Sequence, residues 1–338
     1  MRLARNTCCL LLVAAVGFGQ TAKKKVVIVG LDDAAFGALK KSAPPNVRLE
    51  SPLPANFTAE VADADALIAP QLTRETLQTA KRLAWVHILN AGVEDVLPLV
   101  KDTTITLTNL KVVLGPEVAD HAMALLLSLT RGLYETIPAR GKWEQPENVG
   151  QLTELRGRTA VIVGMGGVGT QIAERAAGFE MTIIGVDPKD PAPSGTAKPV
   201  VMVKPEQLAT VLPQADVVFL TVPETPATKG MIGAAQFHGM KRGAYFIAVS
   251  RGTVYSMDAL VQAISSHRLA GAGLDVTDPE PLPKNHPLWK FKNVVITPHI
   301  AGASDRSLGR VLDLLRENIR RFAAGEPLLN SVDKAKGY

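Results

Sequence analysis

The chain has 338 residues, of which 46% are hydrophobic and 20% are charged. This length favours two domains of ordinary size, and the composition indicates a folded protein and excludes extensive disorder. The formal net charge of +5 comes from Lys and Arg residues that are spread along the chain. Because no long basic run is present, we expect no nucleic acid as a partner.

Residues 1–20 have the layout of a secretory signal peptide. Two arginines precede an apolar stretch from Cys8 to Phe18, and Gly19 offers a cleavage position. The stretch is too short for a stable membrane span. Positive charge at Lys23–Lys25 opposes translocation, so a retained N-terminal tail or a misassigned start codon stays open as the alternative. We expect a periplasmic or secreted protein if the segment is used, and a cytoplasmic protein otherwise.

The chain beyond this segment begins with a first α/β unit. Lys23–Gly30 is a short β-branched run that ends in glycine, which is typical of a buried strand. We predict further strands at Ala66–Ala69 and Trp85–Leu89, with helical spacing over Thr73–Arg82 between them. Val118–Leu133 is rich in Ala, Leu and Met and predicts a long, largely buried helix, which would connect two domains or cover an oligomer interface.

Strands and helices alternate again in the second half of the chain. This alternation implies a parallel sheet with right-handed crossovers. The predicted strands begin at Thr159 and continue at Met181–Val186, Val217–Val222, Tyr245–Val249, Ala272–Asp275 and Val294–Thr297.

A glycine motif lies between the strand at Thr159 and the helix that follows it. Gly164, Gly166 and Gly169 have G-x-G-x-x-G spacing. The first glycine allows a tight turn, the second lets a pyrophosphate approach the backbone, and the third lets helix and strand pack closely. The phosphates would lie at the helix N-terminus, where free N–H groups favour anions. The motif and its context predict a dinucleotide site.

The residue expected to select the dinucleotide is Asp187. It follows the predicted strand Met181–Val186 and lies 18 residues after Gly169, close to the spacing of a carboxylate that binds the adenine ribose. Its charge would repel a 2′-phosphate, which favours NAD over NADP. A turn-forming Asp before Pro188 is the alternative reading, and the nearby Lys189 leaves some room for NADP.

Three further segments follow in order: Ser250–Val254, Ala272–Pro283 and Ile296–Gly302. Together with the glycine motif and Asp187 they resemble the D-isomer-specific 2-hydroxyacid dehydrogenase family in order and in spacing. The resemblance covers nearly everything after residue 25. It implies an NAD-dependent oxidoreductase that acts on the CH–OH group and interconverts a small 2-keto acid and a D-2-hydroxy acid.

The resemblance also implies a catalytic set of Arg251, Glu280 and His299. Arg251 would bind the substrate carboxylate, for which a planar donor fork is well suited. His299 would be the general acid and base, and Glu280 would pair with it and stabilise its protonated form. Taken singly, each residue has a structural explanation in a turn or loop, so the assignment depends on the set.

Further cofactor and substrate contacts are implied by the same resemblance. For the substrate carboxylate the set comprises three backbone donors and one side chain, namely Ala91, Gly92, Val93 and Arg251. For the cofactor the set surrounds the glycine motif and the ends of later strands: Gly164, Gly166, Gly167, Val168, Gly169, Asp187, Val222, Pro223, Thr228, Val249, Ser250, Arg251, Asp275, His299 and Gly302.

Asp275 and three histidines are further polar residues to interpret. Asp275 would contact the nicotinamide amide, or else cap the end of its strand. We interpret His87, His121 and His267 as structural. The two cysteines both lie in the signal-like segment, and we expect no metal site.

The implied fold class is α/β, with a Rossmann-type NAD-binding domain inserted into a discontinuous flavodoxin-like substrate domain. The inserted domain would span residues 119–300, and the substrate domain 24–118 plus 301–330. A homodimer is expected, with the long helix at its interface. The segment Leu110–Gly115 departs from the family pattern, and we expect it to reshape the cleft between the domains.

Two alternatives stay open. The first is an NAD(H)-sensing binding protein of the corepressor type, which would bind NADH without useful turnover. The second is a dehydrogenase of the same fold that acts on another small anion, such as formate or phosphite. The catalytic set alone does not separate the second alternative from the expected reaction.

Overall fold

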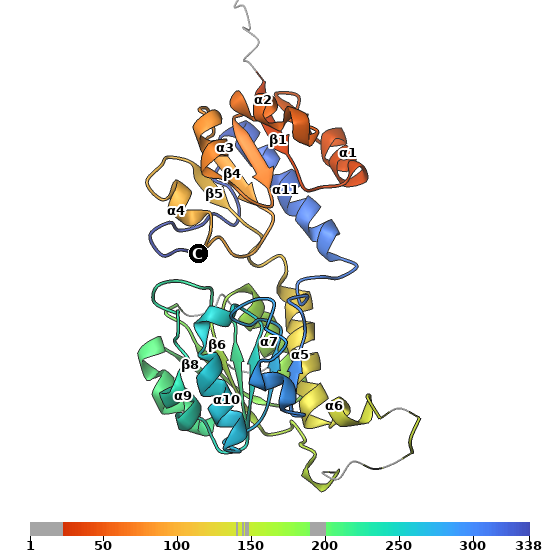
Figure 1. Cartoon of the computed structure of the whole chain (residues 1–338). Coiled ribbons are helices and arrows are strands. Elements are labelled where there is room, and N and C mark those ends of the chain that lie inside the picture. The colour runs from red at the N-terminus through yellow and green to blue at the C-terminus, as the bar shows by residue number, and fades with distance from the viewer. Residues whose placement is uncertain (1–22, 140, 144, 146–148, 190–200) are drawn as a thin grey trace, which may run out of the picture.

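The computed structural model describes residues 23–338 except 140, 144, 146–148 and 190–200. The predicted signal peptide at 1–20 therefore lies outside the described residues. The chain forms two lobes, each built around its own sheet (Figure 1). Over the described ranges, no helix is both long and apolar enough to cross a membrane.

The first lobe contains a five-stranded sheet in which all neighbouring strands are parallel. Its order is β2-β1-β3-β4-β5, which is the order of flavodoxin-like folds. The strands are β1 (Lys24–Ile28), β2 (Val47–Glu50), β3 (Ala66–Ala69), β4 (Trp85–Ile88) and β5 (Thr106–Thr108).

Helices cover both faces of this sheet. One face packs against short helices between the strands, and the other packs against α1 and the C-terminal helix α11, which lie side by side (Figure 1). These helices are α1 (Asp33–Lys41), α2 (Phe57–Ala62), α3 (Arg74–Thr79), α4 (Leu97–Val100) and α11 (Ser307–Ala324). The apolar side of α11 is thus buried on a sheet whose strands come from the first third of the chain.

The second lobe contains a seven-stranded parallel sheet in the order β12-β11-β10-β9-β6-β7-β8. Counted from β6, this is the Rossmann order with one further strand at the edge. The predicted fold class is confirmed. The strands are β6 (Thr159–Val163), β7 (Thr182–Val186), β8 (Val201–Val203), β9 (Val217–Leu220), β10 (Ala244–Ala248), β11 (Leu269–Leu274) and β12 (Val294–Ile296).

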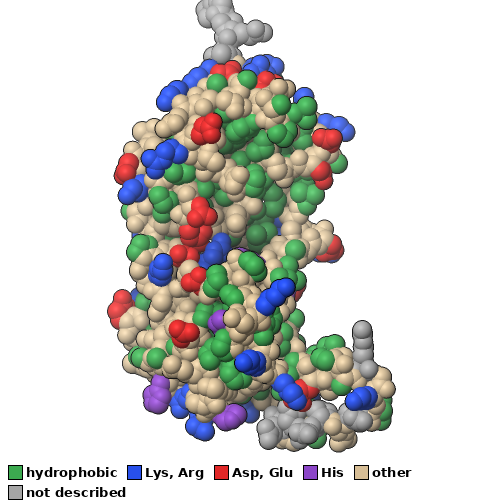
Figure 2. Space-filling view, in the orientation of Figure 1, with side chains coloured by type: hydrophobic (Ala, Val, Ile, Leu, Met, Phe, Trp, Pro, Cys, Tyr) green, Lys and Arg blue, Asp and Glu red, His purple; other side chains and the backbone are tan. Residues whose placement is uncertain are grey.

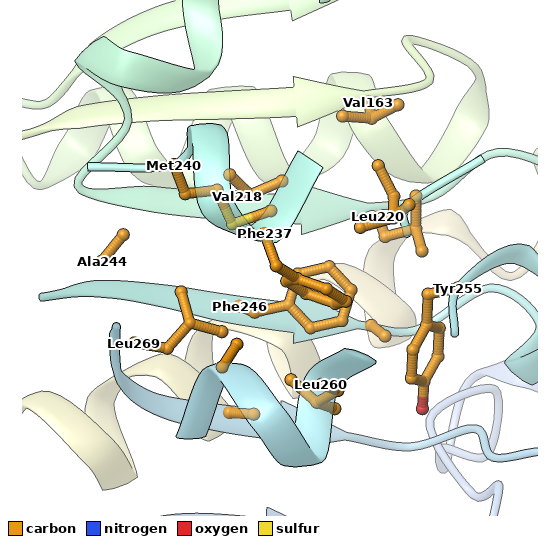
Figure 3. Close-up of a cluster of buried hydrophobic side chains, with 14 of the residues drawn as sticks. Val163, Val218, Leu220, Phe237, Met240, Ala244, Phe246, Tyr255, Leu260 and Leu269 are labelled. Atoms are coloured by element: carbon orange, nitrogen blue, oxygen red, sulfur yellow. The ribbon is translucent and has the colours of Figure 1, made fainter. Parts of the chain in front are cut away.

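Alternate residues of these strands face two separate cores. Figure 3 shows one of them, in which Phe246 of β10 lies between Phe237 and Tyr255 with ring centroids 5.0 and 5.3 Å apart. Helices cover both faces: α5 (Gly115–Thr130) and α7 (Gly167–Gly178) on one side, and α8 (Leu208–Val211), α9 (Ala234–Gly239) and α10 (Met257–Ser265) on the other. Because both faces are covered, the strands read as apolar runs.

The long helix predicted over Val118–Leu133 begins earlier and is interrupted. The structure has α5 at Gly115–Thr130 and a short α6 at Leu133–Thr136, separated by Gly132 in the left-handed region at φ 65°. Ten of the sixteen residues of α5 are buried, and the helix packs on α7 and on β10 to β12. Packing within the chain therefore accounts for its apolar composition.

Three strands were missed from the sequence, and all three lie at sheet edges. β2 and β5 border the first sheet, and β8 borders the second. Each has only three or four residues, and each has at least one exposed position, so none forms a buried apolar run. Short edge strands give too weak a periodic pattern to be separated from loops.

Candidate active site

The glycine motif forms the turn between β6 and α7. Gly164 has φ 100°, and its N–H donates to the carbonyl oxygen of Val186 at 2.8 Å. A Cβ on Gly169 would lie 1.9 Å from the Gly164 oxygen, so only glycine lets helix and strand approach this closely. A Cβ on Gly166, by contrast, would meet nothing within 4 Å. The middle glycine thus faces open space at the N-terminus of a twelve-residue helix.

The crossover between the lobes lies directly on this turn. A Cβ on Gly167 would lie 2.5 Å from the Cα of Val112, in the segment Leu110–Gly115. Val112 has φ 76°, which is unfavourable for a β-branched residue. This segment therefore packs against the start of α7, next to Val168.

Asp187 follows β7 and faces the glycine motif. Its Oδ2 accepts from the backbone N–H of Met165 at 2.9 Å, and its Oδ1 accepts from that of Lys189 at 2.8 Å. The carboxylate is half-buried and held by two backbone donors. It therefore has a defined position beside the turn.

The loop after β9 borders the motif on its other side. Val222 lies against Gly164, because a Cβ on Gly164 would be 2.9 Å from Cγ1 of Val222. Thr228 closes the loop, because its hydroxyl donates to the carbonyl of Pro223 at 2.6 Å and accepts from the N–H of Thr225 at 2.8 Å. β6 and β9 are neighbours at the position where the strand order reverses, which is the usual ligand site of such sheets.

Arg251 follows β10 and reaches across to the first lobe. Its Nη1 donates to the Ser250 carbonyl at 2.8 Å, and its Nε donates to Glu94 Oε1 at 3.0 Å. A Cβ on the next residue, Gly252, would lie 2.0 Å from the carbonyl carbon of Thr277, so the turn packs tightly on the loop after β11. Acidic and basic side chains gather at the waist between the lobes (Figure 2).

The loop after β4 carries the predicted carboxylate donors. The N–H of Ala91 donates to Asn90 Oδ1 at 2.7 Å, and that of Gly92 points to the same oxygen at 3.4 Å. Asn109 donates to the Ala91 carbonyl at 2.5 Å. A Cβ on Gly92 would lie 2.0 Å from Arg251 Nη2, so this loop and the guanidinium are in direct contact.

His299 and Glu280 form a hydrogen-bonded pair. The Nδ1 of His299 lies 2.7 Å from Glu280 Oε2, and Glu280 Oε1 accepts from the N–H of Thr277 at 3.0 Å. An ionised carboxylate only accepts, so Nδ1 carries the proton and Nε2 is left to exchange a proton with a ligand. The backbone of His299 is in the left-handed region at φ 52°. The two side chains come from the ends of β11 and β12.

Asp275 is nearly fully buried at the end of β11. Its Oδ2 accepts from the N–H of Ala301 at 2.9 Å, and its Oδ1 accepts from that of Ile300 at 3.0 Å. These bonds agree with the alternative role of capping the strand end, because they hold the loop that carries His299. A contact with the nicotinamide stays a prediction.

The other predicted cofactor residues lie around the same strand ends. Val249 is buried, and its backbone N–H donates to the Leu220 carbonyl at 3.3 Å. The Ser250 hydroxyl oxygen is buried and has no hydrogen-bond partner within the described part of the chain. The Gly302 carbonyl accepts from the Ser307 hydroxyl at 3.2 Å, in the connection to α11.

Sequence reasoning missed the polar partners of the predicted residues, above all Glu94, Asn90 and Asn109. Glu94 directly follows the predicted carboxylate-binding loop, so an acidic residue at that position was the available signal. In the ranges that the structure describes, no three His, Cys, Asp or Glu side chains lie close enough to hold a metal ion.

Comparison with known proteins gives a consistent family. Residues 123–301 match the model described as D-isomer specific 2-hydroxyacid dehydrogenase, NAD binding domain. A glyoxylate reductase of Korarchaeum cryptofilum is 35% identical over 305 residues, which are 87% of this chain and 88% of that protein. A D-3-phosphoglycerate dehydrogenase of Archaeoglobus fulgidus is 33% identical over 287 residues, but these cover 52% of its length.

Solved structures agree with the sequence matches. A D-isomer specific 2-hydroxyacid dehydrogenase family protein from Aeromonas salmonicida has a TM-score of 0.79 and 28% identity, covering 92% of this chain and 99% of its own. An NADPH-dependent glyoxylate/hydroxypyruvate reductase from Sinorhizobium meliloti, solved with NADP and sulfate, has a TM-score of 0.79 and 26% identity, covering 94% and 100%.

Proposed function

The chain belongs to the D-isomer specific 2-hydroxyacid dehydrogenase family, and from that premise we propose that it reduces a 2-keto acid to a D-2-hydroxy acid, or catalyses the reverse reaction. It is an NAD(P)-dependent oxidoreductase that acts on the CH–OH group. One observation carries the proposal. Arg251, Glu280 and His299 follow the adjacent parallel strands β10, β11 and β12, so all three emerge at one edge of the sheet.

The residues around the glycine motif fit a dinucleotide. Gly166 leaves open space at the N-terminus of α7, where a pyrophosphate would meet free backbone N–H groups. Asp187 would bind the adenine ribose hydroxyls, and Val222 and Thr228 would line the other side. When bound, the reduced nicotinamide supplies the hydride that a keto acid needs to become a hydroxy acid.

Arg251 would bind and orient the substrate carboxylate. Its Nε is bonded to Glu94 and its Nη1 to a backbone carbonyl, so the guanidinium plane is held in one orientation. The Nη2 edge lies against Gly92, beside the loop of backbone donors. A carboxylate bound there would be paired with a charged donor fork, and its 2-carbonyl oxygen would lie near the same charge.

His299 would move the proton. Because Glu280 holds Nδ1, Nε2 is the nitrogen that can donate to the oxygen of the 2-carbonyl during reduction and accept that proton back during oxidation. The ionised Glu280 stabilises the positive charge on the ring while it is protonated. Protonation balances the reduction, because the carbonyl carbon gains a hydride and the oxygen gains a proton.

We further propose NAD as the preferred cofactor, with NADP second. The support is the carboxylate of Asp187, which is held beside the glycine motif and would repel a 2′-phosphate. Solved proteins of the same fold carry NADP or NADPH, so the choice rests on this residue and not on the fold.

The proposal is tested by following NADH oxidation with protein that begins near Thr21. Glyoxylate and hydroxypyruvate come first, because similar proteins are named glyoxylate reductase and glycerate dehydrogenase, and pyruvate, phenylpyruvate and 2-ketoisocaproate extend the range of side chains. We expect turnover with at least one acid. Replacement of Arg251 by Ala should raise KM and lower kcat. Arg251→Lys should lose less activity because it keeps the positive charge, but it should stay below the wild type because it lacks the planar pair of donors.

Two results would contradict the proposal. Tight NADH binding without turnover of any acid would favour the sensing protein. Oxidation of formate or phosphite without activity on any 2-hydroxy acid would favour the other small anion. An Asp258→Asn variant, altered at an exposed position on α10, serves as the control for nonspecific loss of activity.

A further inference from the structure

The helix α5 carries a histidine that reaches the loop of His299. His121 lies on the second turn of α5, one helical turn after Glu117, which bonds to Ser307 and Arg310 of α11 at the junction of the lobes. The Nε2 of His121 lies 2.8 Å from the hydroxyl of Thr297. Sequence reasoning read this histidine as structural only.

The directions of the hydrogen bonds around Thr297 can be assigned. The Thr297 hydroxyl donates its single proton to Asp275 Oδ1 at 2.7 Å, because an ionised carboxylate only accepts. The Thr297 oxygen must then accept from His121, so Nε2 of His121 carries a proton. The result is an ordered chain of donors that runs from His121 through Thr297 to Asp275.

The end of this chain holds the acid/base residue in place. Asp275 binds the N–H groups of Ile300 and Ala301 with its carboxylate, and the N–H of His299 with its own carbonyl at 3.0 Å. Asp275 therefore holds the backbone at His299 and at the two residues after it. His299 itself has the left-handed backbone conformation. Any shift of Asp275 would move the His299 ring.

The carboxylate of Asp275 also lies close to His121 itself. The carboxylate side chain is 1% exposed, and His121 Nε2 lies 3.5 Å from Oδ1. Among the described residues, no Lys or Arg forms an ion pair with Asp275, so His121 is the basic group that faces it. A buried carboxylate needs hydrogen-bond donors around it to offset the cost of its burial and to hold it in position.

We propose that His121 is a positioning residue of the reaction, which orders the Thr297 and Asp275 side chains and thereby holds His299 in its productive orientation. The inference rests on the proposed function, in which His299 moves the proton. His121 itself touches neither substrate nor cofactor in this assignment. Its effect should therefore appear in kcat more than in the binding of either ligand.

The test compares His121→Leu, which removes the donor, with His121→Gln, whose amide N–H can occupy the position of Nε2. We expect kcat for the keto acid to fall roughly 10- to 100-fold in His121→Leu, because small displacements of a reacting group have effects of this size. KM for the acid and Kd for NADH should change less than about threefold in the same variant. His121→Gln should restore most of kcat.

A second pair keeps the test independent of the folding of His121→Leu. Thr297→Val removes the hydroxyl at nearly constant volume, and Thr297→Ser retains it. We expect Thr297→Val to reproduce the loss of kcat and Thr297→Ser to keep it. The double variant His121→Leu/Thr297→Val should be no slower than the slower single variant, because both interrupt one chain.

Three outcomes separate the possibilities. If the wild type reduces a keto acid and both His121→Leu and Thr297→Val keep its kcat, the inference about His121 is overturned while the proposed function stands. A parallel loss of kcat, NADH affinity and melting temperature that Gln does not restore would assign His121 a purely structural role, which also overturns it. A wild-type protein that reduces no 2-keto acid would overturn the proposed function, and this inference with it.

Discussion

The contact between Glu94 and Arg251 joins loops of the two lobes through one ion pair. The two side chains are 27% and 22% exposed, so the pair is partly shielded from water. Partial burial strengthens the attraction, but it also raises the cost of desolvating both charges. A substrate carboxylate that reaches Arg251 would therefore meet a guanidinium that Glu94 already orients.

The first prediction at this scale concerns Asp187. Replacement by Ser should lower KM for NADPH and raise KM for NADH, so that the preference between the two shifts at least about tenfold, because a carboxylate close to a 2′-phosphate costs several kcal/mol at short range. Initial rates with both cofactors measure the shift. Asp258→Asn changes the net charge equally and should leave the preference unchanged. An unaltered preference in Asp187→Ser would show that this carboxylate does not face the ribose.

The second concerns the buried His87. Burial lowers its pKa from the ordinary 6.5 to about 4, and its Nδ1 lies 2.7 Å from the Thr108 hydroxyl. Between these values the unfolded chain binds a proton that the folded chain does not. The stabilisation is therefore complete above about pH 6.5 and is lost as the pH falls towards 4, by up to about 3 kcal/mol.

Urea unfolding at pH 7, 5.5 and 4.5 measures this effect. His87→Gln should weaken the pH dependence, because Gln does not titrate. His267→Asn removes an exposed histidine and should leave the pH dependence as in the wild type. If the free energy of unfolding changes equally with pH in the wild type and in His87→Gln, burial of a neutral His87 is not the cause of the pH dependence.

At the scale of elements, two helices connect the lobes. α5 begins at Gly115, directly after the crossover, and packs on α7, where a Cβ on Gly115 would lie 2.6 Å from the Gly167 oxygen. α11 begins at Ser307 and packs on the first sheet. Arg310 of α11 pairs with the buried Glu117 of α5. The two helices thus meet where the chain passes between the lobes.

The prediction at this scale concerns the packing of α11. Leu315 is fully buried between α11 and the first sheet. Leu315→Ala should lower the free energy of unfolding by about 2–5 kcal/mol, which is the usual cost of such a cavity. Leu308→Ala, at an exposed position of the same helix, should cost little. Equal losses in the two variants, measured by urea unfolding, would contradict this packing.

At the scale of the whole molecule, a segment after α5 extends away from the second lobe. Figure 1 shows α6 and the chain beyond it projecting from the lobe. Large apolar side chains on this segment are exposed, namely Leu133, Ile137 and Trp143. Side chains of this kind are commonly buried by a partner surface, so we propose that they lie in the interface of a homodimer.

The corresponding prediction is tested by light scattering after size exclusion. The wild type should have twice the mass of one chain, and Ile137→Asp together with Trp143→Asp should shift it to the mass of one chain. Leu53→Asp places one such negative charge at an exposed apolar position on the first lobe and should stay dimeric. A monomeric wild type would contradict the proposed interface.

Features that are local in the chain could be predicted from the amino-acid sequence. Apolar runs predicted the central strands, because strands buried on both faces need continuous hydrophobic residues. Glycine spacing predicted the turn after β6, since φ 100° at Gly164 and the close approach at Gly169 exclude other residues. Together with the resemblance, the motif order indicated Arg251, Glu280 and His299 as one set. Each single motif is contained within a few adjacent residues.

The contacts between distant residues, by contrast, depend on the folded arrangement of the chain. The Glu94 and Arg251 bond joins residues 157 positions apart, and the His121 and Thr297 bond joins residues 176 positions apart. Such contacts depend on strand order and helix packing, which leave no periodic mark in a single sequence. The same reason explains the missed edge strands, because a three-residue strand such as Thr106–Thr108 is defined by its neighbour and not by its own pattern.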